Sequence, residues 1–163
     1  MKKYAFFVTA ICVLYSLSTV AQTDFSGTWL LKDHQSISGT LYSNGVPKQI
    51  TVTQSPKLLI IEKITAGADG VDFTSIDTLS SDGKAFKSIT ASKRKKETTL
   101  KWNADKTSCT IQSMAYNPQE AKKVDFRNTD TWTLENDQLV QVRKNENFTN
   151  GETWESKAIY DKQ

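Results

Sequence analysis

Short stretches in which apolar and polar residues alternate follow one another from residue 25 to the end of the chain, separated by turn-forming residues. A period of two is typical of strands with one buried face, and many short strands at close spacing indicate an all-β domain. The pattern predicts ten strands: Phe25 to Lys32, Gln49 to Gln54, Leu58 to Ile64, Val71 to Leu79, Phe86 to Ser92, Thr98 to Asn103, Ser108 to Ala115, Phe126 to Leu134, Leu139 to Lys144 and Glu152 to Tyr160.

Hairpin turns are predicted between several of these strands. Residues 81–84 suit a tight turn with Gly83 at positive φ, residues 135–138 suit a short polar turn, and Asn150-Gly151 is a two-residue hairpin signal. Consecutive strands are therefore expected to pair antiparallel. The only weak helical candidate is residues 118–123, which is short enough to be one turn in a loop.

The predicted strands need a closed arrangement because an open sheet leaves unpaired edges. Closing an up-and-down barrel of about 8–10 antiparallel strands hides those edges best. The fold class is therefore all-β, with a two-sheet β-sandwich as the alternative.

The first 21 residues have the features of an export signal. Lys2 and Lys3 precede an uncharged stretch, and Ala21 offers a small-residue cleavage site before Gln22. We expect a signal peptide over 1–21 and a single barrel domain over 22–163, in a secreted or periplasmic protein that is not stably inserted in a membrane after cleavage. An uncleaved anchor and a lipid anchor at Cys12 remain alternatives, although Ile11 rather than a small residue precedes Cys12.

Charge and cysteine content narrow the possible partners. The net charge is +3, and the 21 basic residues less Lys2 and Lys3 against 18 acidic ones leave about +1 after cleavage. A near-neutral chain does not favour nucleic acid, whose phosphates need clustered basic residues. Cys109 is then the only cysteine, so no disulfide is expected, and its place in a strand predicts a buried side chain.

The start of the predicted domain carries a family resemblance. Phe25, Gly27 and Trp29 resemble the Gly-x-Trp opening of the calycin barrels, which comprise the lipocalins and the intracellular fatty-acid-binding proteins. The resemblance implies a barrel in which Trp29 plugs the closed end and Gly27 allows close backbone approach. Because it lies directly after a predicted signal, the chain looks closer to an exported bacterial lipocalin-like domain.

The last strand resembles the fatty-acid-binding proteins only in part. Tyr160 matches their Arg-x-Tyr terminal strand, but Ala158 stands where the arginine belongs. That arginine would supply the charge-assisted bond to a carboxylate, so a fatty-acid clamp is not carried over. The lid helices of that family are not expected either, because residues 33–48 show no helical period.

Alternation within the strands assigns residues to the interior of such a barrel. One face of the Phe126 strand combines Asn128, Asp130 and Trp132, and similar mixtures recur on other strands. Rings together with polar groups are typical of a pocket, although the opposite register, with Ile76 and Ile159 inward, remains open. The predicted ligand-binding residues are Phe73, Trp102, Asn128, Asp130, Trp132, Trp154 and Tyr160.

These residues favour a non-catalytic protein that holds a small hydrophobic or amphipathic molecule without a cofactor. The alternative is a filled barrel whose surface binds an envelope polymer or a protein, and the oligomeric state stays open. A small glycan-acting enzyme with Asp77 and Asp130 as its carboxylate pair is a third reading. His34, the only histidine, is expected in an exposed loop, so neither a zinc site nor a serine triad is predicted.

One basic run stands out, formed by Lys93, Arg94, Lys95 and Lys96. Its simplest interpretation is a solvated hairpin end that guards a sheet edge. The alternative is a patch that attracts an anionic partner.

Overall fold

The computed structural model describes residues 21–40, 45–67, 69–90 and 92–163, so the predicted export signal lies outside the described residues except for Ala21. The described part contains ten strands and no helix, and the weak helical candidate at 118–123 is a turn. None of it is a helix long and apolar enough to cross a membrane. The strands are β1 (Gly27–Ser38), β2 (Gln49–Gln54), β3 (Leu58–Ala66), β4 (Asp72–Ser80), β5 (Phe86–Ile89), β6 (Lys95–Trp102), β7 (Ser108–Tyr116), β8 (Val124–Glu135), β9 (Gln138–Asn147) and β10 (Thr153–Lys162).

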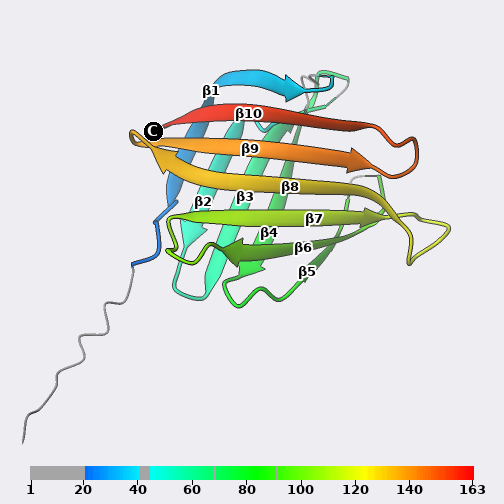
Figure 1. The fold of residues 1–163 in the computed structure, drawn as a ribbon, viewed down its shortest axis with the longest axis horizontal. Coiled ribbons are helices and arrows are strands. Elements are labelled where there is room, and N and C mark those ends of the chain that lie inside the picture. Colours follow the sequence, from blue (N-terminus) through cyan, green and yellow to red (C-terminus); the bar gives the residue numbers. More distant parts are fainter. Residues whose placement is uncertain (1–20, 41–44, 68, 91) are drawn as a thin grey trace, which may run out of the picture.

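All ten strands belong to one antiparallel sheet that curls into a nearly closed barrel (Figure 1). The sheet order is β4-β3-β2-β1-β10-β9-β8-β7-β6-β5, so the first strand pairs with the last. This confirms the predicted all-β barrel over the sandwich. We call the end with the β9–β10 turn (148–152) and the β7–β8 loop (117–123) the open end, and the opposite end the closed end.

The barrel wall is not continuous between β4 and β5. The tight turn after β4 forms as predicted, with Gly83 at a φ of 79°. Nevertheless, β4 and β5 are neighbours in the chain that share no ladder, so the expectation that every consecutive pair of strands is hydrogen-bonded is wrong here. Residues 81–85 separate the two strands, and all four residues of β5 pair with β6. Both sheet edges therefore face the same opening.

Two other turns test the hairpin predictions. Between β8 and β9, Asn136 and Asp137 have φ values of 51° and 62°, which matches the two-residue turn with two positive φ angles. The predicted two-residue turn at Asn150-Gly151 is wrong, because 148–152 all lie between β9 and β10. The loop is longer because its backbone hydrogen bonds are made to Asn147. The Asn147 carbonyl accepts from the Gly151 N–H at 2.9 Å, and the Asn147 N–H donates to the Glu152 carbonyl at 2.8 Å.

The first strand is longer than predicted, and His34 lies within it rather than in an exposed loop. Its pairing with β10 shifts register between Leu31 and Asp33 and again between Ser36 and Ser38. Such bulges reverse which residues face inward. Counting alternate residues from Trp29 therefore fails to place His34 on the inner face, although His34 pairs with the buried Ala158.

Burial along the strands confirms the predicted faces. Trp154, Ser156, Ala158 and Tyr160 are all buried along β10. On β4, Asp77 and Leu79 are buried whereas Ile76 is exposed, which excludes the opposite register.

A cluster of large side chains fills the closed end. Before β1 begins, the chain crosses this end and is held where the Thr23 N–H donates to the Lys106 carbonyl at 3.0 Å. Phe25 then stacks on Trp102, with ring centres 5.6 Å apart, and meets the edge of Trp132 at 5.9 Å. Trp29 is buried beside them, and its indole N–H donates to the Phe25 carbonyl at 2.8 Å. This half of the barrel is solid core.

Cys109 belongs to this core and is a free, buried thiol, as predicted. Burial, assisted by the negative charge of Asp130, raises its pKa to about 12. The thiol is thus a small apolar group at physiological pH.

Candidate functional site

A layer of five charged side chains lies across the barrel between the solid core and the open end. We call it the ionic layer; its members are Lys63, Asp77, Lys96, Asp130 and Arg143. It contains three basic and two acidic side chains, so with all five ionised it carries one uncompensated positive charge. Buried charges are tolerated when they are paired and hydrogen-bonded, and the surplus cation therefore has to be accounted for.

Asp130 and Arg143 form a two-pronged ion pair. They face each other across β8 and β9, and the guanidinium donates from Nε and Nη2 to the two carboxylate oxygens at 2.6 and 2.8 Å. Burial alone would raise the pKa of Asp130, but the charge and hydrogen bonds of Arg143 outweigh it and hold that pKa below 3.8. Arg143 Nη1 also donates to the Gly45 carbonyl, which ties the loop before β2 to the barrel interior.

Asp77 is shared by two ammonium groups. Lys96 Nζ lies 2.7 Å from one carboxylate oxygen, and Lys63 Nζ lies 3.5 Å from the other. Burial lowers the pKa of Lys63, although the carboxylates of Asp77 and Asp130 oppose that shift. Lys63 therefore has the weaker contact with the shared partner.

The basic run is correctly placed at the β5–β6 hairpin end, but it is not simply a solvated surface. Lys96 points inward to Asp77, and Arg94 pairs with the buried Asp125 while its guanidinium lies 5.3 Å from the centre of the Phe126 ring. Lys93 and Lys95 stay exposed. A charge run gives no sign of which of its members face inward, so the prediction of a wholly solvated run is wrong.

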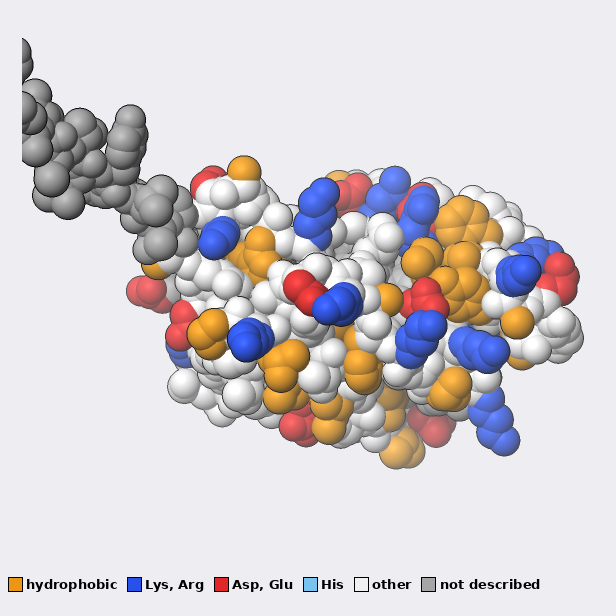
Figure 2. All heavy atoms as spheres, turned by 90° about the horizontal axis from the view of Figure 1, so that it is seen from below, with side chains coloured by type: hydrophobic (Ala, Val, Ile, Leu, Met, Phe, Trp, Pro, Cys, Tyr) orange, Lys and Arg blue, Asp and Glu red, His pale blue; other side chains and the backbone are white. Residues whose placement is uncertain are grey.

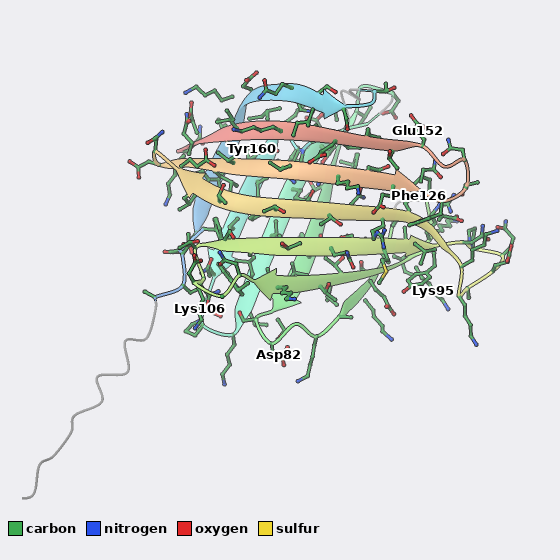
Figure 3. All side chains as sticks on the ribbon, in the orientation of Figure 1. Asp82, Lys95, Lys106, Phe126, Glu152 and Tyr160 are labelled. Atoms are coloured by element: carbon green, nitrogen blue, oxygen red, sulfur yellow. The ribbon has the colours of Figure 1, made fainter. Side chains whose placement is uncertain are left out.

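Above the ionic layer, a cavity of about 410 Å³ opens at the open end; we call it the mouth cavity. The amides of Asn128 and Asn145 form one wall and are joined by a hydrogen bond of 2.6 Å. Phe126 and Trp154 supply rings, and Arg143 reaches the cavity from the ionic layer. Figure 3 shows Phe126 and Glu152 at this end and Tyr160 farther toward the closed end. The lining residues are Gly45, Phe126, Asn128, Arg143, Asn145, Asn147, Glu152 and Trp154.

Arg143 has donors left for a ligand in this cavity. A guanidinium carries five N–H groups, and the contacts to Asp130 and Gly45 use three of them. Nearby, Ser156 Oγ and His34 Nε2 are buried without a hydrogen-bond partner among the described residues. Burial and the charge of Arg143 lower the pKa of His34, so its imidazole is neutral at physiological pH. The interior beside Arg143 thus presents unused donors and acceptors.

The structure separates the seven predicted ligand-binding residues into groups. Asn128 and Trp154 line the mouth cavity, and Asp130 holds Arg143 beneath it. Trp102, Trp132 and Tyr160 belong to the solid core or pack against it. The Tyr160 hydroxyl lies 3.0 Å from Gln141 Oε1 and 3.2 Å from the Pro47 carbonyl, two acceptors that compete for its one hydrogen. Phe73 is far more exposed, at the gap between β4 and β5.

Arg143, Asn145, Lys63 and Lys96 were not among the predicted site residues. Their strands were recognised, and alternation from Leu139 through Gln141 to Arg143 would have placed that arginine inside. Lys63 carries the same signal, because it alternates with the buried Leu59 and Ile61.

Comparison with solved structures finds the same barrel fold in other proteins. Zebrafish ileal bile acid-binding protein, solved with cholic acid, matches with a TM-score of 0.52 at 13% identity over 85% of this chain and 98% of its own. The fluorescent protein UnaG matches with a TM-score of 0.52 at 12% identity, over 85% of this chain and 97% of its own. No family model and no curated protein matches the sequence. At such identities the likeness shows the fold alone, and it agrees with the calycin architecture expected from Gly27 and Trp29.

Proposed function

We propose that the protein is a non-catalytic binding protein that holds a small amphipathic molecule in the mouth cavity. The observation that carries the proposal is the lining of that cavity, where the rings of Phe126 and Trp154 lie beside the amides of Asn128 and Asn145 and the guanidinium of Arg143. Its volume of about 410 Å³ is within the range of small-molecule sites. The cholic acid in the similar zebrafish structure is an amphipathic molecule of this kind and supports the proposal.

The chemistry of the lining specifies the ligand further. Arg143 donates but cannot accept, so the group that reaches it must accept hydrogen bonds. Trp154 offers apolar surface for a ring or chain. The favoured ligand is therefore a compact apolar body with a carbonyl, carboxylate or sulfonate at the end that enters first.

An enzyme that uses Asp77 and Asp130 is disfavoured by the state of these carboxylates. A glycosidase needs one carboxylic acid that keeps its proton near neutral pH. Burial raises the pKa of both groups, but their cationic partners outweigh that effect and leave both below 3.8. Both are ionised at pH 7 and committed to salt bridges.

We also propose that the protein is exported after cleavage between Ala21 and Gln22. The support is the charged start and the uncharged stretch of the sequence. The mass of the intact protein from its own host tests this, since a retained Met1 segment would contradict it.

Native mass spectrometry of protein purified gently from its host, followed by solvent extraction, tests the binding function. We expect a bound amphipathic molecule, and the extracted molecule can then be titrated while tryptophan fluorescence is recorded. Trp154→Ala should weaken its binding at least about tenfold, because a stacked ring contributes on the order of 1 kcal/mol beyond the area it buries. Glu155→Gln, on the opposite face of β10, should leave binding unchanged.

Two results would contradict the proposal. One is a wild-type protein that carries nothing and whose fluorescence no lipid, pigment or hydrophobic metabolite changes. The other is a folded Trp154→Ala variant that binds as tightly as the wild type. Either would favour the alternative of a barrel that acts through its surface.

A further inference from the structure

The gap between β4 and β5 holds a second cavity, separate from the mouth cavity. Its volume is about 490 Å³, and its lining residues are Phe73, Thr74, Ser75, Ile76, Ser88, Ile89, Thr90 and Lys96. By alternation, Phe73, Ser75 and Ser88 belong to the inner faces of their strands, whereas Ile76 and Ile89 belong to the outer faces. Because both faces contribute, the cavity passes through the wall of the barrel. We call it the lateral opening.

Three exposed apolar side chains border the lateral opening, one from an inner face and two from outer faces. Phe73 is 45% exposed, Ile76 57% and Ile89 64%, and all three border the same opening. Figure 2 shows this side of the molecule, where apolar side chains are exposed among Lys and Arg side chains. Single exposed apolar residues are ordinary, but three that converge on one cavity form a surface for an alkyl chain.

The inner part of the lateral opening carries a cation and a hydroxyl. Lys96 reaches from β6 to Asp77 on β4, so its ammonium group lies behind the gap. Ser88 Oγ is buried without a hydrogen-bond partner among the described residues. A buried polar atom without a partner costs free energy that a ligand can recover.

The charge balance of the ionic layer determines which ligand this end suits. Asp130 is engaged by Arg143, and Asp77 alone serves both Lys63 and Lys96. An anion that binds Lys96 would compensate the surplus positive charge and still leave Asp77 with Lys63. A cation at the same place would add a like charge to the layer and is disfavoured.

From this geometry we propose that the lateral opening is a second binding site, which takes an anionic amphiphile with its charged group on Lys96 and Ser88 and its alkyl chain on Phe73, Ile76 and Ile89. This site is independent of the function proposed for the mouth cavity, since the two linings share no residue.

Titration of the ¹⁵N-labelled protein with three ten-carbon amphiphiles tests the proposal. Decanoate should shift the amide resonances of Ile76, Ser88 and Ile89 saturably, whereas decyltrimethylammonium and decanol should bind this site at least about tenfold more weakly, as expected for loss of a charge-assisted hydrogen bond. Equal shifts with all three probes would mean simple apolar adsorption and would overturn the proposal, as would decanoate shifts confined to the open end.

Variants separate this site from a general attraction to the basic run. Lys96→Gln should weaken decanoate binding about tenfold, whereas Lys95→Gln, its exposed neighbour on the outer face, should have little effect. Equal losses in both variants would overturn the proposal. Because Lys96→Gln also removes an ion pair, Ser88→Leu provides a second test: it fills the opening beside Lys96 without removing a charge from the ionic layer and should block decanoate.

The mouth cavity supplies the last control. Trp154→Ala should leave the shifts of Ser88 and Ile89 unchanged even if it abolishes binding at the open end. A loss of both sets of shifts in this variant would mean one continuous site and would contradict a separate lateral one. The experiments can therefore contradict the lateral site without contradicting the mouth-cavity site, and the reverse.

Discussion

Replacing the two deeply buried tryptophans of the closed end provides a quantitative test of how that end is built. Trp29 is 1% exposed, and its indole N–H donates to the Phe25 carbonyl at 2.8 Å. A buried tryptophan removes roughly 150–250 Å² from water, which corresponds to about 4–6 kcal/mol. Because cores relax partly around a deletion, we expect Trp29→Ala to lower the free energy of unfolding by about 4 kcal/mol.

Phenylalanine at the same two positions isolates the hydrogen bond. Trp29→Phe keeps most of the ring but leaves the Phe25 carbonyl without its donor, so we expect a cost of about 2–3 kcal/mol. Trp132 is equally buried, yet its indole nitrogen has no hydrogen-bond partner among the described residues. Trp132→Phe removes that unpaired donor together with some volume, and we expect a cost of only about 1 kcal/mol.

Urea unfolding followed by far-ultraviolet circular dichroism measures all three variants, with equal m-values as the check that they unfold alike. The reasoning is refuted if Trp132→Phe costs as much as Trp29→Phe. A loss below about 1 kcal/mol in Trp29→Ala would show that Trp29 does not plug the barrel.

Three further predictions concern the buried ionisable groups. Cys109, with its pKa of about 12, should resist iodoacetamide at pH 8 in the folded protein and react after unfolding; equal rates in both states would contradict its burial. The pKa of Asp130 is lower in the folded protein than its ordinary 3.8, so the unfolded chain takes up this proton first and stability should fall as the pH drops below about 4. Asp130→Asn should flatten this pH dependence in urea titrations. The same variant should lower the free energy of unfolding by about 3–5 kcal/mol at pH 7. Burial lowers the pKa of Lys63 below 10.5, so the unfolded chain keeps this proton to a higher pH than the folded protein, and Lys63 makes stability rise with pH up to about 10.5. Lys63→Met should remove this rise in stability. Because Asp77 keeps its ion pair with Lys96, the variant should also raise the thermal midpoint at pH 7.

The ten strands were accessible from the sequence because their signals are local. Alternation and turn residues define each strand, and the turn at Asn136 and Asp137 formed as expected. The end of β1 was not accessible, since the bulge after Leu31 reverses the alternation at a place that no residue type marks. The missing ladder between β4 and β5 was equally hidden, because a well-formed turn at Gly83 does not require the strands it joins to pair.

The site was predicted only in part, because side chains of one type take different roles at different depths. Trp132 and Trp154 give the same signal in the sequence, yet one lies in the solid core and the other lines the mouth cavity. Depth along the barrel axis follows from the register between strands, which a single sequence does not give. Likewise, Lys95 and Lys96 are adjacent and chemically identical, and only their faces distinguish the exposed group from the one that reaches Asp77.

The pairing of β1 with β10 has a consequence for how the barrel folds. All but one of the strand pairs join neighbours in the chain, and only this pair joins its two ends. Trp29 lies opposite Lys162, whereas Thr23 lies across the closed end beside Lys106, so a linker that spans this end can join residues 22 and 163, and new ends within 81–85 would interrupt no ladder. In such a circular permutant every strand pair is a hairpin or joins strands flanking the linker. Since folding rates fall as contacting residues lie farther apart in the chain, the permuted barrel should fold faster than the natural one while keeping the same core.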